Sequence, residues 1–125
     1  MPYTNGVRFT ELPGIDNRYV VPSRRFIQLA YASTISLVPQ HEEVKVFFNR
    51  LTGNMTITSN VNTPYVGDKL ILFFQSDASP RTVTFSTGFI TNATVVVAAS
   101  KEANIEFTFS DKSQSWVETS RFIQS

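Results

Sequence analysis

The sequence predicts an all-β fold: an antiparallel, jelly-roll-like β-sandwich with an extended N-terminal arm. Apolar and polar residues alternate over short runs, polar turns recur roughly every 8–12 residues, and no stretch has the 3.6-residue period of a helix. With 125 residues, 42% of them hydrophobic, the chain is long enough to bury one core. We therefore expect an arm over residues 1–25 and a β-sandwich domain over residues 26–125.

Residues 1–25 are expected to form the arm because Pro2, Gly6, Pro13, Gly14 and Pro22 interrupt both helix and regular strand. The apolar side chains scattered along the arm are expected to be buried against other residues. They either lie against a neighbouring subunit or wrap the arm's own domain and cover a sheet edge. Four arginines and four apolar or aromatic residues, in or next to the arm, are the expected partner-binding residues. They are Arg8, Phe9, Leu12, Arg18, Tyr19, Arg24, Arg25 and Phe26.

From Phe26 onward the apolar residues recur with a period of two, as in a half-buried strand. The alternation changes phase near Ser33, which predicts a bend or a bulge. Residues 44–58 alternate on both sides of a polar turn at 51–54, so we expect a β-hairpin there.

Four further strands are expected in the second half of the chain. Residues 69–76 are apolar on both faces, as in a central strand or in one whose second face meets a partner. In residues 81–86, Val83 and Phe85 are expected to point inward. Residues 104–110 and 115–120 alternate on either side of a polar turn and predict a final hairpin, in which Ile105, Phe107 and Phe109 are expected to point inward.

Composition narrows the possible functions. Eleven basic and ten acidic residues give a formal charge of +1, which predicts neither a nucleic-acid nor a membrane partner. The absence of cysteine removes disulfides and thiolate chemistry, which fits assembly in a reducing cytosol. No run is apolar enough for a membrane helix, and the first residues do not resemble a cleavable signal peptide.

The sequence offers little for catalysis. The single histidine, His41, has no partner at metal-ligand spacing and is expected to be an exposed loop residue. Glu106 and Glu118 fall on neighbouring predicted strands, where a carboxylate pair of a glycosidase is one interpretation and a solvated sheet face is the other. We favour the solvated face and expect a non-enzymatic protein with no cofactor and no metal site.

A set of motifs in the second half carries a resemblance. Val-Gly-Asp-Lys-Leu-Ile-Leu-Phe-Phe (66–74) is followed by Arg-Thr-Val-Thr-Phe-Ser-Thr-Gly-Phe (81–89), Asn-Ile-Glu-Phe-Thr-Phe (104–109) and Ser-Trp-Val-Glu-Thr-Ser-Arg (115–121). The series resembles a small β-domain of tailed-phage virion proteins, such as head decorations, head fibres and auxiliary capsid proteins; those of crAss-like phages are the most similar kind. It covers about half of the chain, and the first 65 residues carry no such resemblance.

The resemblance implies an architectural role. It implies a homo-oligomer, most plausibly a trimer, on the capsid surface of a virion assembled in the host cytoplasm. The expected partners are the major capsid protein and other virion proteins. The alternative is a carbohydrate-binding or adhesin module of a head fibre or tail, with Trp116, Tyr65 and Phe89 as a stacking platform. In that case Trp116 must be exposed, whereas an indole more often fills a core.

Overall fold

The fold is all-β, as the alternation predicts, and the structure is a computed structural model that describes residues 18–21, 26–40 and 42–125. Its strands are built by period-two alternation. In β10, for example, Ala103, Ile105, Phe107 and Phe109 are buried and the residues between them are more exposed. The strands are β1 (Arg18–Val21), β2 (Phe26–Leu29), β3 (Thr34–Pro39), β4 (Glu43–Phe48), β5 (Met55–Ser59), β6 (Lys69–Gln75), β7 (Arg81–Phe85), β8 (Phe89–Ile90), β9 (Val95–Val97), β10 (Glu102–Ser110) and β11 (Ser115–Ile123).

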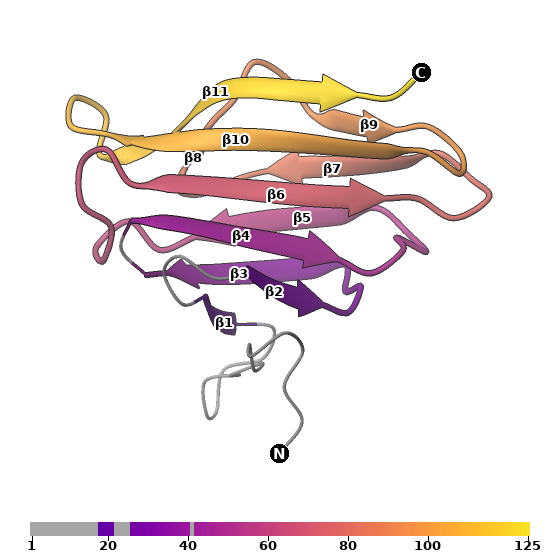
Figure 1. Ribbon diagram of the computed structural model, residues 1–125, viewed down its shortest axis with the longest axis horizontal. Coiled ribbons are helices and arrows are strands. Elements are labelled where there is room, and N and C mark those ends of the chain that lie inside the picture. Colours follow the sequence, from indigo (N-terminus) through magenta and orange to yellow (C-terminus); the bar gives the residue numbers. More distant parts are fainter. Residues whose placement is uncertain (1–17, 22–25, 41) are drawn as a thin grey trace.

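The strands form two sheets. We call the first the odd sheet, with the order β1-β3-β5-β7-β9, and the second the even sheet, with the order β2-β4-β6-β10-β11-β8. From β1 to β7 the chain passes from one sheet to the other with every strand. Successive turns of the chain are therefore laid side by side, from β1 and β2 at the bottom of Figure 1 to β9 and β11 at the top.

This winding makes most neighbouring strands parallel, and the expectation of an antiparallel sheet is wrong for them. Six of the nine ladders between described strands are parallel: β1–β3, β3–β5, β5–β7, β2–β4, β4–β6 and β8–β11. The other three, β7–β9, β6–β10 and β10–β11, are antiparallel. The last ladder is the expected final hairpin, which is confirmed. Alternation sets which face of a strand is buried, but it does not set the direction of the neighbouring strand.

The hairpin expected over residues 44–58 is wrong for the same reason. β4 pairs with β2 and β6, whereas β5 pairs with β3 and β7, so the connection between β4 and β5 crosses from one sheet to the other. Leu51 is fully buried in this crossing. Its N–H donates to the carbonyl of Gln75 and its carbonyl accepts from the N–H of Asp77, which hold the crossing against the end of β6.

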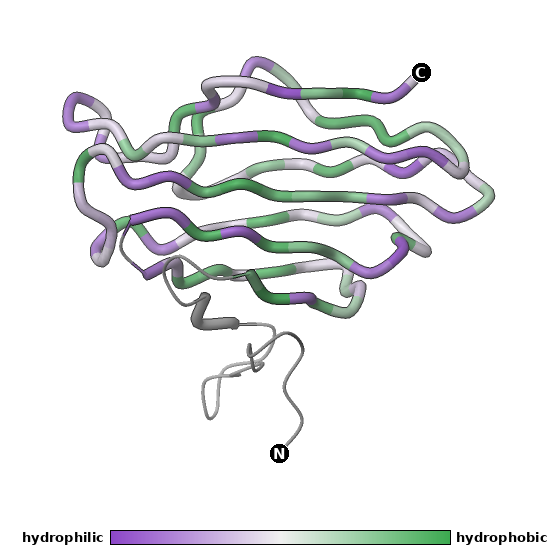
Figure 2. The backbone as a smooth tube through the Cα atoms, in the orientation of Figure 1, coloured by the Kyte–Doolittle hydropathy of each residue, from purple (hydrophilic) through white to green (hydrophobic). Residues whose placement is uncertain are grey.

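The chain bends at Ser33, which confirms the bend that was one of the two expectations; the bend lies in a crossing between the sheets and is not a bulge within one strand. Ile27 and Leu29 are buried from the even sheet, and Ile35 and Leu37 from the odd sheet. Both sheets contribute to a single core cluster, whose largest members are Trp116, Phe48, Phe74 and Phe107. Hydrophobic positions accordingly run along the strands, while the turns are mostly hydrophilic (Figure 2).

Part of the expected arm lies in a sheet. Arg18–Val21 form β1 and pair in parallel with β3, and Phe26 begins β2. Arg18–Val21 thus add a strand to the odd sheet. Residues 1–17 and 22–25 lie outside the described residues.

Candidate functional site

The outer face of the even sheet carries a row of aromatic side chains. Phe26, Phe47 and Phe73 come from the adjacent strands β2, β4 and β6 and are half-buried. Because successive side chains of a strand point to opposite faces, the next residue along each strand points into the core and these three rings lie on the outer face. The rings of Phe47 and Phe73 are stacked, with centroids 4.2 Å apart and an interplanar angle of 5°. On the other side of Phe47, Phe26 meets it in T-shaped geometry at 5.5 Å. We call these three residues the aromatic row.

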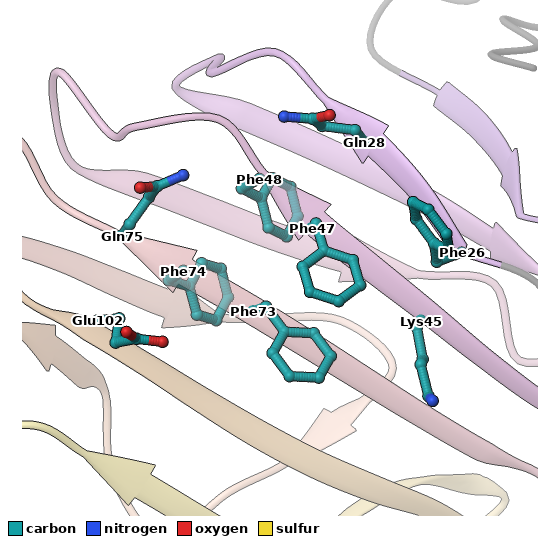
Figure 3. Close-up of a pocket in the computed structure, with 9 residues that line it drawn as sticks. All are labelled: Phe26, Gln28, Lys45, Phe47, Phe48, Phe73, Phe74, Gln75 and Glu102. Carbon is teal, nitrogen blue, oxygen red and sulfur yellow. The ribbon is translucent and has the colours of Figure 1, made fainter. Parts of the chain in front are cut away.

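A groove of about 530 Å³ lies at the aromatic row, and Figure 3 shows the side chains around it. The volume falls within the range of small-ligand sites in proteins. The polar residues that line the groove include two amides, a cation and a carboxylate. One of the amides, Gln28, donates a hydrogen bond from its Nε2 to Oδ1 of Asn49 at 2.6 Å. The residues that line it are Phe26, Gln28, Lys45, Phe47, Phe48, Phe73, Phe74, Gln75 and Glu102.

A second depression of about 350 Å³ adjoins the first, because Gln75 and Glu102 line both. This one is polar. It is lined by Arg50, Gln75, Ser76, Asp77, Ala78, Ser100, Lys101, Glu102 and Gln124. We call the two adjoining depressions together the sheet-face groove, with an aromatic end and a charged end.

The carboxylates of the charged end differ in their partners. Asp77 accepts two hydrogen bonds from Arg81, from Nε at 2.9 Å and from Nη2 at 2.8 Å. These bonds lower the pKa of Asp77 below its ordinary value and raise that of Arg81. Among the residues that the structure describes, Glu102, Arg50 and Lys101 take part in no ion pair. Their charges are therefore available at the surface of the groove.

The two glutamates considered as a glycosidase pair do not come together. Glu106 lies on the outer face of the even sheet, with its carboxylate 3.6 Å from Nζ of Lys69. Glu118 is paired in register with the buried Phe107, on the opposite face, and binds Arg121. Two carboxylates on opposite faces of one sheet cannot flank a single glycosidic bond.

The expected sugar platform is not assembled either. Trp116 is fully buried and packs against Phe109 in T-shaped geometry. Phe89 is half-buried against Phe85 and Phe107, while Tyr65 is 64% exposed. The stacked aromatic rings on the outer face of the even sheet are instead those of Phe47 and Phe73, with Phe26 beside them.

The structure describes only some of the expected partner-binding residues. Phe26 belongs to the aromatic row. Arg18 and Tyr19 are placed in β1 by their backbone pairing with Ser36 and Leu37. The remaining five, Arg8, Phe9, Leu12, Arg24 and Arg25, lie outside the described residues, as does His41.

Sequence reasoning missed Phe47 and Phe73, although a signal was present. The chain contains two Phe-Phe pairs, Phe47–Phe48 and Phe73–Phe74, at equivalent positions of adjacent strands. Because successive side chains of a strand point to opposite faces, each pair must place one ring outside the core. Parallel pairing of β4 with β6 then sets the two outer rings side by side.

Within residues 18–21, 26–40 and 42–125, no group of three or more His, Asp or Glu side chains is arranged to hold a metal ion. The same residues contain no helix long and apolar enough to cross a membrane. The chain is thus a two-sheet β protein with a groove on the outer face of one sheet. A comparison of the chain with protein-family models and with curated proteins finds no match.

Proposed function

We propose that this chain is a non-enzymatic structural protein of a tailed-phage virion, an auxiliary capsid or decoration protein that binds the major capsid protein and stabilises the head. The motifs that carry the resemblance support this proposal by their position. They fall on or beside β6, β10 and β11 of the even sheet and β7 of the odd sheet. In the proposal, the two sheets packed over one core retain the sandwich class expected from the sequence.

One observation carries the docking part of the proposal. β1 and β2 are the terminal strands of the two sheets, and they lie at the same end of the body (Figure 1). Among the described residues, each pairs on one side only. Such an edge can accept a strand from another chain, and the arm that precedes it can order on the same partner. Arg8, Phe9, Leu12, Arg18, Tyr19, Arg24, Arg25 and Phe26 are the proposed contact residues.

The proposal puts the protein on the capsid surface, as a homo-oligomer with a trimer favoured, assembled with the virion in the host cytoplasm. A protein that binds only the assembled shell stabilises that shell by mass action. No catalytic step is required.

Deletion of residues 1–17 tests this docking. The deletion stops there because β1 begins at Arg18 and is part of the odd sheet. We expect the truncated chain to keep its β circular-dichroism spectrum and its cooperative unfolding, and to stop cosedimenting with capsids that bind the full chain. Lys112→Gln, at the exposed turn between β10 and β11, is the control that should cosediment normally. Undiminished cosedimentation of the folded, truncated chain would show that the arm is not the docking element.

A second function, the carbohydrate-binding or adhesin module of a head fibre or tail, is favoured by the sheet-face groove. An aromatic ring beside amides and carboxylates is the usual composition of a concave site for a polar small molecule. A glycan array with the full chain tests it. The Phe73→Ser variant should lose any signal, and Val96→Thr, which changes an exposed apolar residue of the odd sheet, should retain it.

A further inference from the structure

The strands at the centre of the sheet-face groove have no free edge. β4, β6 and β10 each have a ladder on both sides: β4 with β2 and β6, β6 with β4 and β10, and β10 with β6 and β11. A peptide cannot add as a strand where both edges are paired, because strand addition needs free backbone N–H and C=O groups. Among the described residues, β2, which contributes Phe26 and Gln28, has one unpaired edge. Over β4, β6 and β10, recognition must therefore come from side chains.

Those side chains suit a ligand rich in hydroxyl groups. The amides of Gln28, Gln75 and Gln124 each offer a donor and an acceptor, which is what adjacent hydroxyls of a sugar require. In Figure 3, Gln28, Gln75 and Glu102 lie to one side of the rings of Phe47 and Phe73, and Phe26 and Lys45 lie to the other. A ligand that is polar along its edge and apolar on its ring face fits this arrangement.

At the aromatic end of the groove, one aromatic ring face is open for contact with a ligand. Phe47 has Phe73 stacked on one side and Phe26 on the other, so it is enclosed within the aromatic row. Phe73 is covered by Phe47 on one side only, and its neighbour in register on β10 is the smaller Asn104. The face of Phe73 toward β10 is thus the surface on which a sugar ring can stack.

The charged end selects the charge of the ligand. Arg50 and Lys101 line it together with the carboxylates of Asp77 and Glu102. Because Arg81 neutralises Asp77, the two cations face only one unpaired carboxylate. A guanidinium beside an ammonium favours a carboxylate ligand, which the arginine fork can bind through two hydrogen bonds.

We propose that the sheet-face groove binds an acidic oligosaccharide, with one sugar ring against Phe73 and a uronate carboxylate held by Arg50 and Lys101. This inference rests on the second function above and names its ligand class. Phe26 of β2 belongs both to the aromatic row and to the proposed docking residues, whereas the residues proposed to hold the ligand, Phe73, Arg50 and Lys101, lie outside β1 and β2.

Isothermal titration of the full chain with tetragalacturonate tests the inference, with the neutral galactose tetrasaccharide and tetraglutamate as comparison ligands. We expect saturable binding of tetragalacturonate that weakens with added salt, because salt screens exposed charges. Arg50→Gln and Lys101→Gln should each weaken binding roughly tenfold, the value of one charge-assisted hydrogen bond. Glu102→Gln should strengthen it, since it removes the like charge.

Two controls separate this effect from a general one. Lys112→Gln removes an exposed cation at the turn between β10 and β11, beyond the end of β10 opposite Glu102, and should leave the affinity unchanged. Phe73→Ser should abolish binding, and Lys101→Gln keeps the test valid if Phe73→Ser fails to fold. Equal binding of the neutral tetrasaccharide would overturn the acidic preference and leave the carbohydrate-binding function intact. Equal binding of tetraglutamate, or no saturable binding of tetragalacturonate, would overturn the inference.

Discussion

Arg121 and Glu118 form a two-point ion pair on the core-facing side of β11. Nε of Arg121 lies 2.6 Å from Oε2 of Glu118, and Nη2 lies 2.8 Å from Oε1. The same guanidinium donates to the carbonyl oxygens of Ala93 and Thr94, and Glu118 accepts the N–H of Asn92 at 3.1 Å. The pair therefore fastens the connection between β8 and β9 to β11, at the end of the body opposite β1 and β2 (Figure 1).

Arg121→Ala is expected to destabilise the protein by about 1–3 kcal/mol, because it leaves the Glu118 carboxylate without its cation and removes the two hydrogen bonds from the guanidinium to Ala93 and Thr94. The side chain of Glu118 is only 6% exposed, so water replaces the lost partner poorly. Urea denaturation at pH 7 measures the change. Lys112→Ala is the matched control and should stay within about 0.5 kcal/mol of the parent protein.

The same pair predicts a pH dependence of stability. Hydrogen bonds from Arg121 are the main cause that lowers the pKa of Glu118, and they outweigh the effect of burial. The folded carboxyl thus binds its proton less readily than the unfolded one. Its contribution to stability is fully present above the ordinary glutamate pKa of about 4.3, and it is lost as the pH falls through the lower folded-state pKa.

Glu118→Gln isolates that contribution. The parent protein should be the more stable of the two at pH 7, and the difference in unfolding free energy should shrink as the pH is lowered through this window. Thermal melts followed by circular dichroism at a series of pH values provide the measurement. A difference that stays constant from pH 7 down to the acid limit would mean that the carboxylate charge contributes nothing.

Sequence alone predicted the strands well and their pairing poorly. The alternation in residues 104–110 correctly placed Ile105, Phe107 and Phe109 in the core, because the face to which a strand side chain points follows from its position along that strand. Whether the chain after Phe48 turns back beside β4 or crosses to the other sheet depends on distant partners. The crossing is favoured when Leu51 is buried against β6, which lies about twenty residues further along the chain.

The candidate site was less predictable for the same reason. The apolar outer face of residues 69–76 indicated a second contact surface, and Phe73 lies on it. That Phe47 stacks on Phe73 follows from the parallel register of β4 and β6, which no local pattern contains. Arg50 and Lys101 lie fifty-one positions apart in the sequence and line the same depression only through the fold.

The buried crossing between β4 and β5 gives a direct test of the winding. Leu51→Ala is expected to cost about 2–5 kcal/mol, as for other fully buried leucines, because it opens a cavity in the core. If residues 44–58 formed a hairpin, Leu51 would be an exposed turn residue and the change would be nearly neutral. Thr52→Ala, at the exposed neighbouring position, is the control. Chemical denaturation of both variants gives the two free energies; equal small values would contradict the crossing.

Two glycines with positive φ, Gly88 and Gly67, provide a matched pair of positions. Gly88 lies in the connection that leads into β8, and Gly67 lies just before β6. Gly88 has φ +96°, and its carbonyl accepts the N–H of Trp116 at 2.9 Å. A β-carbon at this position would press on the carbonyl oxygen of Ser59 and lie 3.3 Å from Cγ1 of Val61. Gly67 has a similar φ of +91°, but a β-carbon there would meet nothing within 4 Å.

Gly67→Ala should therefore cost only the conformational penalty, about 1 kcal/mol, whereas Gly88→Ala should cost about 2–4 kcal/mol because the backbone at Ser59 must also shift. Trp116 fluorescence should report the difference as well, since movement of Gly88 disturbs its hydrogen bond to the backbone N–H of Trp116 and so shifts that residue. Unfolding curves followed by that fluorescence measure both effects in one experiment. If the two variants lost the same stability, the close approach of Gly88 to Ser59 would not matter to the fold.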